Sequence, residues 1–222
     1  MKKENRKARS WVFIGVGSTL IIVAAYFLIS LFPSADSINT EGINQEGFES
    51  LYLPADAQRN PVRRSAGGPV ENSPDRIIIE AIGLDAPVVK AETVITRVDN
   101  KEVIQFLVPE KFAAGWYDAS AVLGEPGNTV ISGHHNAFGK VFEHLIDLKE
   151  GEPFILKSGG KEFSYTIVKR LVVKEKNEPL RVRLENARWM MPTDNERVTL
   201  ITCWPKRTNS HRLIIVGFPA DQ

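Results

Sequence analysis

Residues 198–216 read VTLITCWPKRTNSHRLIIV and decide the fold class of this 222-residue chain. Two short apolar runs rich in β-branched residues, 198–202 and 213–216, flank a polar stretch that opens with Trp204 and Pro205. β-branched residues favour strands, and a proline does not continue the ladder of a central strand, so the chain leaves the sheet at Pro205. The pattern predicts an antiparallel pair of strands joined by residues 204–211.

Six further apolar runs precede this pair, each bounded by Gly, Pro, Asp or Asn. They lie at 77–79, 87–89, 103–108, 128–131, 154–156 and 163–168. Eight short strands within residues 76–222 indicate an all-β barrel or sandwich with one hydrophobic core. Short helices are expected at 138–148, where apolar residues share one helical face, and near 180–189.

Cys203 is the only cysteine of the chain, which excludes an internal disulfide and a zinc site built from several cysteines. It ends the first strand of the pair, so we expect it at a loop mouth rather than in the core. A thiolate is a nucleophile, and Arg212 faces Cys203 across the predicted pair, where a guanidinium stabilises a thiolate or an oxyanion. The alternatives are an inert buried cysteine and an ordinary surface arginine.

Four histidines offer candidate acids or bases. His134 and His135 follow a predicted strand that ends in Ser132-Gly133, and an imidazole at that position titrates near neutral pH. The alternatives are turn histidines without a role, or a pair that binds a stray metal. We expect His144 to be solvated in the predicted helix, and His211 to point away from the face that carries Arg212.

An N-terminal run of 22 uncharged residues, 11–32, is long enough to cross a membrane. As a helix it spans about 33 Å, against a bilayer core of roughly 30 Å. Residues 1–10 hold five of the 28 basic residues and one of the 27 acidic ones, and a positive flank stays in the cytoplasm. We expect a basic cytoplasmic head at 1–10 and a single-pass anchor at 11–32. A cleaved signal peptide would have a shorter apolar region and small residues at its cleavage site.

Residues 33–75 are poor in periodicity and rich in Ser, Asn, Glu, Pro and Gly, so we expect an extended stem. A short apolar segment at 51–53 within this stem is suited to pack against another apolar surface. Residues 76–222 then form the globular domain. Residues 11–222 hold 23 basic and 26 acidic residues, a net charge of −3, which gives no reason to expect a nucleic-acid partner.

Three segments together resemble the sortase family. TLITC at 199–203 matches the T-L-x-T-C motif, GEPGNTVISGH at 124–134 resembles the segment with the catalytic histidine, and SHRLI at 210–214 resembles the strand with the catalytic arginine. The stretch 78–88 resembles the opening strands of the family, with Glu80 where proline is usual. The resemblance covers residues 76–219 in the right order and spacing.

The resemblance implies an eight-stranded sortase-type β-barrel and a catalytic triad. By position, Cys203 is the nucleophile, His134 the acid and base, and Arg212 the oxyanion stabiliser, with His135 as the competitor of His134. Thr202 and Ser132 are the expected substrate contacts. No cofactor and no metal are implied; the carboxylates of Glu175, Glu178 and Glu185 form no clear calcium cluster and are interpreted as a solvated face.

Sortases cut a sorting signal of LPxTG type after its threonine and join the acyl group to an amine. The resemblance thus implies a cysteine transpeptidase with thiol-protease and hydrolase character, on the outer side of a Gram-positive-type cell membrane. Its partners would be secreted proteins with a C-terminal sorting signal and an amine acceptor, either a peptidoglycan precursor of the cell wall or a pilin subunit.

The subclass stays open. Residues 203–205 and the anchor resemble class D or E, whereas 210–212 resembles class C, whose lid motif and second membrane helix are not found in this sequence. Two other hypotheses are weighed. An exported L,D-transpeptidase requires an S-x-G-C-x-R motif that 202–205 does not match. A non-catalytic, membrane-tethered sortase-fold adhesin or assembly scaffold need not keep Cys, His and Arg together.

Overall fold

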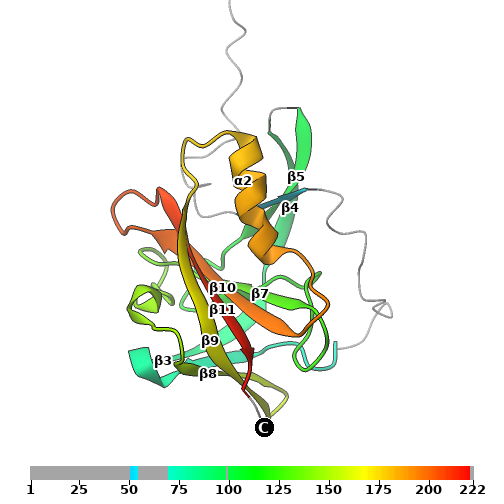
Figure 1. Ribbon diagram of the computed structural model, residues 1–222, viewed down its shortest axis with the longest axis vertical. Coiled ribbons are helices and arrows are strands. Elements are labelled where there is room, and N and C mark those ends of the chain that lie inside the picture. The colour runs from blue at the N-terminus through cyan, green and yellow to red at the C-terminus, as the bar shows by residue number, and fades with distance from the viewer. Residues whose placement is uncertain (1–50, 55–69, 99, 221–222) are drawn as a thin grey trace, which may run out of the picture. The chain divides into compact units, whose positions relative to one another are not determined.

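Eight strands close into a β-barrel in the computed structural model (Figure 1). The structure describes residues 51–54, 70–98 and 100–220, which lie in one compact unit, Gly47–Gln222. In order around the barrel the strands are β10 (Arg197–Trp204), β11 (His211–Pro219), β9 (Lys161–Lys174), β8 (Pro153–Ser158), β2 (Arg76–Ile79), β3 (Leu84–Lys90), β6 (Ala114–Trp116) and β7 (Asn128–Ser132). Neighbouring strands are antiparallel, except that β6 runs parallel to β3, and β7 runs parallel to β10 where the barrel closes.

Alternating residues separate the inside of the barrel from its outer face. Leu200 and Leu213 point inward and are fully buried in the main core. Their chain neighbours Ile201 and Ile214 point outward, into a second apolar cluster. Burial of each such side chain stabilises the fold by roughly 1.5–3 kcal/mol. β10 and β11 are therefore apolar on both faces, which explains their unbroken apolar runs.

A small sheet and a helix cover that outer face. The sheet has the order β1-β5-β4, with β1 at Leu51–Pro54, β4 at Glu92–Val98 and β5 at Lys101–Leu107. Ile104 and Phe106 of β5 pack in the outer cluster together with Met190 of η6. The helical segments are α2 (Leu180–Asn186) and η6 (Ala187–Met190), and Figure 1 shows α2 beside β4 and β5.

The predicted all-β barrel with short helices is confirmed, with two differences among its strands. The run 103–108 forms most of β5, which lies outside the barrel, and β6 takes its place. β6 has only three residues, too few for an alternating pattern to be visible in sequence. The short apolar segment 51–53 belongs to β1, which pairs with β5.

The helix predicted at 138–148 was wrong. The chain forms turns there and one 3-10 segment, η5 (Leu145–Asp147). Residues 138–140 all have positive φ angles, which a right-handed helix does not allow. Four apolar residues that share the predicted helical face are buried nonetheless, so their spacing reflects burial rather than a helix; they are Val141, Phe142, Leu145 and Leu148. The second predicted helical segment, near 180–189, is confirmed as α2 and η6.

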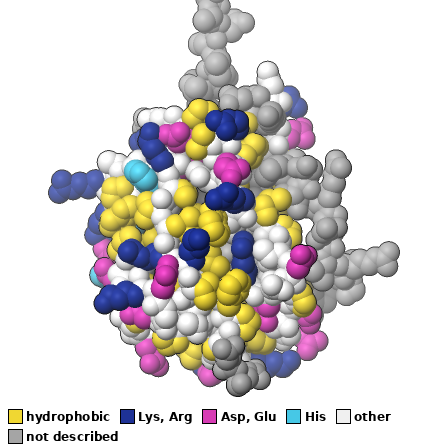
Figure 2. Space-filling model, viewed as in Figure 1, with side chains coloured by type: hydrophobic (Ala, Val, Ile, Leu, Met, Phe, Trp, Pro, Cys, Tyr) yellow, Lys and Arg dark blue, Asp and Glu magenta, His cyan; other side chains and the backbone are white. Residues whose placement is uncertain are grey.

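The cytoplasmic head, the membrane anchor and most of the stem, predicted at 1–75, lie outside the described residues. Within the residues that are described, no helix is both long enough and apolar enough to cross a bilayer. On the coloured part of the face in Figure 2, basic, acidic and hydrophobic side chains are interspersed. This part of the surface therefore presents no continuous region of one charge.

Candidate active site

Three strand ends meet at one edge of the barrel. β7 and β10 are parallel, so both reach this edge with their C-terminal ends, and β11 begins there because it is antiparallel to β10. Cys203 is the penultimate residue of β10 and Arg212 the second residue of β11. His134 lies two positions beyond the end of β7. The topology alone thus gathers three reactive side chains from distant parts of the sequence.

Cys203 and Arg212 lie directly opposite each other in the ladder between β10 and β11, as the sequence predicted. They share the outer face of the barrel with Ile201 and Ile214, because alternate residues of a strand point the same way. The Cβ atoms of opposed residues are about 4.5–5.5 Å apart, so an arginine side chain at this position is long enough to reach the thiol. Both side chains are buried.

The peptide before His134 is held against β10 by two hydrogen bonds. The backbone N–H of Gly133 donates to the carbonyl of Ile201 (3.1 Å), and Thr202 Oγ1 donates to the carbonyl of Gly133 (2.7 Å). A Cβ atom at position 133 would stand 2.6 Å from Phe142 Cδ2 and 2.7 Å from Val141 Cγ1. Only glycine therefore lets the chain pass close enough to bring His134 to the site.

The three predicted catalytic residues line one small pocket. Val108, which directly follows β5, also lines this pocket. The predicted substrate contacts, Ser132 and Thr202, also line this pocket. Their hydroxyls donate to backbone carbonyls, Ser132 to Gly115 (3.5 Å) and Thr202 to Gly133.

His135 takes a different position from His134. It does not line the pocket; its Nδ1 lies 3.4 Å from the carbonyl oxygen of Phe142, and its ring meets that of Trp204 edge-on at 5.3 Å. The geometry therefore favours His134 over His135 as the imidazole that acts with Cys203.

Burial shifts the pKa of His134. It lowers the pKa of the imidazole below its ordinary value of 6.5, and a hydrogen bond to the backbone of Val108 acts in the opposite direction. Burial likewise lowers the pKa of His135, against the carbonyl of Phe142. A lowered pKa favours the neutral imidazole, the form that takes a proton from a thiol or an amine.

Two asparagines tie the loop of His134 to the loop that precedes Arg212. Asn136 Nδ2 donates to the carbonyl of Lys206 (2.5 Å) and to Asn209 Oδ1 (3.2 Å). The guanidinium of Arg212 in turn donates from Nη1 to the carbonyls of Asn209 (3.5 Å) and His211 (3.3 Å). These bonds couple the positions of the imidazole and the guanidinium.

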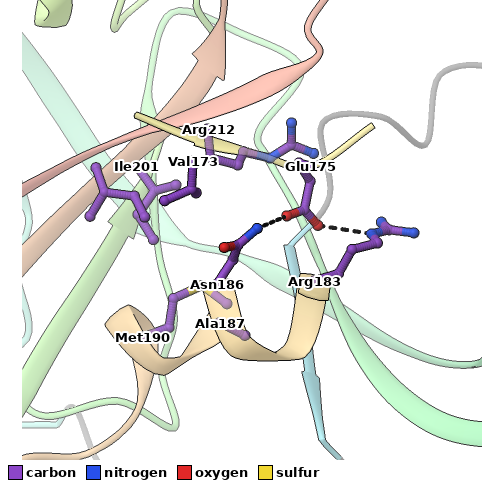
Figure 3. A pocket seen from close by; sticks show the side chains of 9 residues that line it. Val173, Glu175, Arg183, Asn186, Ala187, Met190, Ile201 and Arg212 are labelled. Carbon is purple, nitrogen blue, oxygen red and sulfur yellow. Dashed lines mark hydrogen bonds and ion pairs between the residues drawn. The ribbon is translucent and has the colours of Figure 1, made fainter. Parts of the chain in front are cut away.

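A second pocket adjoins the first and shares Ile201 and Arg212 with it. Figure 3 shows its walls, which come from β9, β10, β11 and the α2–η6 segment. The walls are largely apolar, and they are formed by Val173, Ala187, Met190, Ile201 and Ile214.

Glu175 forms the polar end of this second pocket. Its carboxylate accepts hydrogen bonds from Arg183 Nε (2.9 Å) and Asn186 Nδ2 (3.1 Å), both on α2 (Figure 3). The interpretation of Glu175 as part of a solvated face was wrong, because α2 folds over it and buries it.

Comparison with known proteins gives the family. The family model described as a sortase domain matches residues 77–220, well over half of the chain. The chain belongs to the sortase family. The resemblance of the three sequence motifs is thereby confirmed at the level of the family.

Named relatives of this sortase are distant. Sortase SrtE1 of Streptomyces coelicolor is 26% identical over 91 residues, which are 41% of this chain and 26% of the relative. Sortase A of Bacillus anthracis is 26% identical over 145 residues, 64% of this chain and 57% of the relative. The chain thus spans less than two thirds of the length of each relative.

A solved structure shares the barrel. The crystal structure of sortase C1 from Streptococcus agalactiae matches with a TM-score of 0.51 at 18% identity, covering 75% of either chain. At this identity the likeness concerns the fold of the sortase domain alone.

Sequence reasoning missed several residues around the site of this sortase. Asn136 and Asn209 lie 73 positions apart, and no local sequence pattern predicts the hydrogen bond between them. Asn209 has a positive φ angle, which asparagine tolerates. Val108 was seen only as part of a strand. Among the residues that the structure describes, no group of three or more His, Cys, Asp or Glu side chains is placed to hold a metal ion.

Proposed function

We propose that this sortase is a cysteine transpeptidase that cuts an LPxTG-like sorting signal after its threonine and transfers the acyl group to an amine. The observation that carries the proposal is the shared pocket of His134, Cys203 and Arg212 at one barrel edge. A thiol, an imidazole and a guanidinium supply the three functions that acyl transfer needs: a nucleophile, a proton carrier and an oxyanion stabiliser.

The first half of the reaction forms a thioester. The neutral imidazole of His134 takes the thiol proton of Cys203 and becomes protonated. The resulting thiolate attacks the carbonyl carbon of the threonine, and the guanidinium of Arg212 donates to the oxyanion that develops. The bond from that carbon to the glycine nitrogen then breaks. The protonated imidazole of His134 gives its proton to the departing amine, which leaves a neutral ring.

The second half resolves the thioester. The nitrogen of the acceptor amine attacks the same carbonyl carbon and passes a proton to the neutral imidazole of His134. The carbon–sulfur bond breaks, and Cys203 returns to the thiolate. Water in place of the amine gives hydrolysis instead, so the fate of the thioester depends on which nucleophile reaches the His134 side.

We assign the acyl part of the substrate to the second pocket. This pocket begins at Arg212, is not lined by His134, and has the apolar walls of Ile201, Ile214 and Met190. Such walls suit the leucine and proline side chains of the sorting signal, since ligand sites are mostly apolar with few polar groups. The peptide before the cut would thus lie along the outer face of β10 and β11.

The cellular setting follows from the N-terminal sequence. With residues 11–32 as a single-pass anchor and residues 1–10 in the cytoplasm, the barrel would work on the outer side of a Gram-positive-type cell membrane. Its substrates would be secreted proteins with a C-terminal sorting signal. Its acceptor would be an amine of a cell-wall precursor or of a pilin subunit.

The test uses the full-length protein in detergent, a small library of LPxTG-type peptides and several amines, with products read by mass spectrometry. We expect a covalent adduct on Cys203 and a peptide joined to the amine after its threonine, both absent in Cys203→Ala. A protein that binds the peptides without an adduct or product is the non-catalytic scaffold and overturns the proposal. Turnover by Cys203→Ala at the wild-type rate overturns the mechanism.

A further inference from the structure

Two exposed phenylalanines lie on the His134 side of the site. The rings of Phe138 and His134 are 4.9 Å apart at an angle of 50°. Phe112 lies against the residue that follows Phe138, because a Cβ atom at Gly139 would come within 2.7 Å of Phe112 Cβ. The exposed fractions of Phe112 and Phe138 are 50% and 45%. These two residues, from the segments after β5 and β7, form what we call the aromatic ledge.

The ledge is maintained against an unfavourable backbone. Phe138 has a φ of 46°, in the left-handed region that a bulky residue rarely adopts. The turn is fixed by two backbone bonds, from Lys140 N–H to the carbonyl of Ala137 (2.8 Å) and from Phe142 N–H to the carbonyl of His134 (2.9 Å). Strained residues of this kind cluster at functional sites. A half-exposed aromatic ring contributes little to the core, so core packing does not account for the conformation.

The chemistry of acyl transfer assigns the two sides of the site. His134 protonates the leaving nitrogen and deprotonates the incoming one, so both nitrogens come within hydrogen-bonding reach of its imidazole. The second pocket, which would hold the acyl chain, contains Arg212 but not His134. The groups attached to either amine therefore extend over the surface around His134, where Phe138 and Phe112 are exposed.

We propose that the aromatic ledge binds the acceptor, an amine whose neighbouring atoms are aliphatic or peptide groups that pack on the two rings. The inference rests on the proposed function and concerns the second half of that reaction. The acceptor nitrogen bonds to the thioester carbon, the bond to Cys203 sulfur breaks, and the proton passes to His134. An acceptor seated on the ledge also excludes water from the thioester, so aminolysis outcompetes hydrolysis.

The experiment measures the ratio of aminolysis to hydrolysis of one acyl-enzyme. The full-length protein is acylated with an LPxTG-type peptide, and the thioester is then resolved by one of two acceptors. Triglycine is an extended amine that can contact the ledge. Hydroxylamine is too small to contact the two rings. We expect Phe112→Ala and Phe138→Leu to lower the ratio with triglycine on the order of tenfold and fivefold. With hydroxylamine the ratio is expected to stay within twofold of the wild type.

This ratio is insensitive to the speed of acylation, since it compares two fates of the same thioester. Phe112→Ala also leaves the ring on His134 in place. The matched control is Phe218→Ala, which is expected to change neither ratio. Phe218 is a comparably exposed phenylalanine near the end of β11 that lies away from Arg212.

Each outcome decides. If both ledge variants keep the wild-type ratio with triglycine, or lose it equally with hydroxylamine, the inference is overturned while the proposed function stands. If the wild-type protein forms no acyl-enzyme, the proposed function fails and the inference falls with it.

Discussion

The thiol of Cys203 and the guanidinium of Arg212 project from directly opposed positions on adjacent antiparallel strands, nine positions apart in the chain. Their separation is therefore set by the strand ladder and not by a flexible loop. His134 reaches the same pocket from β7, whose end is fixed beside β10. Side chains held on strands keep a productive geometry better than side chains on loops, which suits the nucleophile and the oxyanion donor.

Arg212→Ala is expected to lower kcat/KM for peptide cleavage on the order of 10²–10³, the loss typical of a missing oxyanion donor. Arg212→Lys keeps the charge but not the planar fork, and we expect it to restore only part of the rate. The measurement is the initial rate of cleavage at low peptide concentration. Arg76→Ala serves as the control, because Arg76 is exposed and paired with Asp85 away from the site. A near wild-type rate in Arg212→Ala would exclude this residue from the chemistry.

His134→Ala and His135→Ala separate the two neighbouring imidazoles. His134 lines the pocket, so its removal is expected to reduce the rate about 10²–10⁴-fold, the range of a general acid–base catalyst. His135 packs on Trp204 and Phe142 outside the pocket, and its variant is expected to keep most activity. Comparing single-turnover rates of acylation checks this. The opposite order would reverse the assignment.

The sequence predicted what local pattern determines. The position of Cys203 opposite Arg212 followed from one short connection between two apolar runs, and seven of the eight apolar runs became strands of the barrel. The sequence pattern did not predict which segments pack against one another in the folded domain. The spacing of apolar residues at 138–148 fits a helix and a buried run of turns equally well, and only the positive φ angles distinguish them.

The burial of Glu175 is a second feature that the sequence pattern did not predict. Its charge and polar neighbours predicted a solvated face, yet α2, which follows it in sequence, returns over the carboxylate with Arg183 and Asn186. The bond between Asn136 and Asn209 depends likewise on two loops meeting at the barrel edge. Periodicity reports the environment of one segment, whereas these contacts depend on the packing of the whole barrel.

Arg183→Leu is expected to lower the free energy of unfolding by roughly 1–3 kcal/mol, because it leaves a buried carboxylate with one partner fewer. The side chain of Glu175 is 7% exposed and that of Arg183 is 20% exposed. Arg188→Leu is the matched control on the adjoining η6, where Arg188 pairs with Glu185 and both side chains are over 60% exposed. Its loss is expected to be about 0–1 kcal/mol.

Urea unfolding curves compare the two arginine variants. Replacing Glu175 by leucine as well is expected to recover much of the loss of Arg183→Leu, since the unpaired buried charge is then gone. Equal stability of the two single arginine variants would contradict the buried pair.

The free energy of unfolding of the domain is expected to fall as the pH drops from 7.5 to 5.5. Burial lowers the pKa of His134 and of His135 in the folded protein, so near pH 6.5 and just below the unfolded chain binds more protons than the folded one. Stability rises with pH wherever the unfolded state binds more protons, which gives the sign. Carboxylates add to the pH dependence of stability only at pH values below this window. Glu143 is one of them, because its hydrogen bond with Lys206 lowers the pKa of the carboxyl below its ordinary value. Melting temperatures at the two pH values, at constant ionic strength, are compared with those of the double variant His134→Gln, His135→Gln. The difference is expected to shrink in the variant, and a difference of unchanged size would show that other groups cause it.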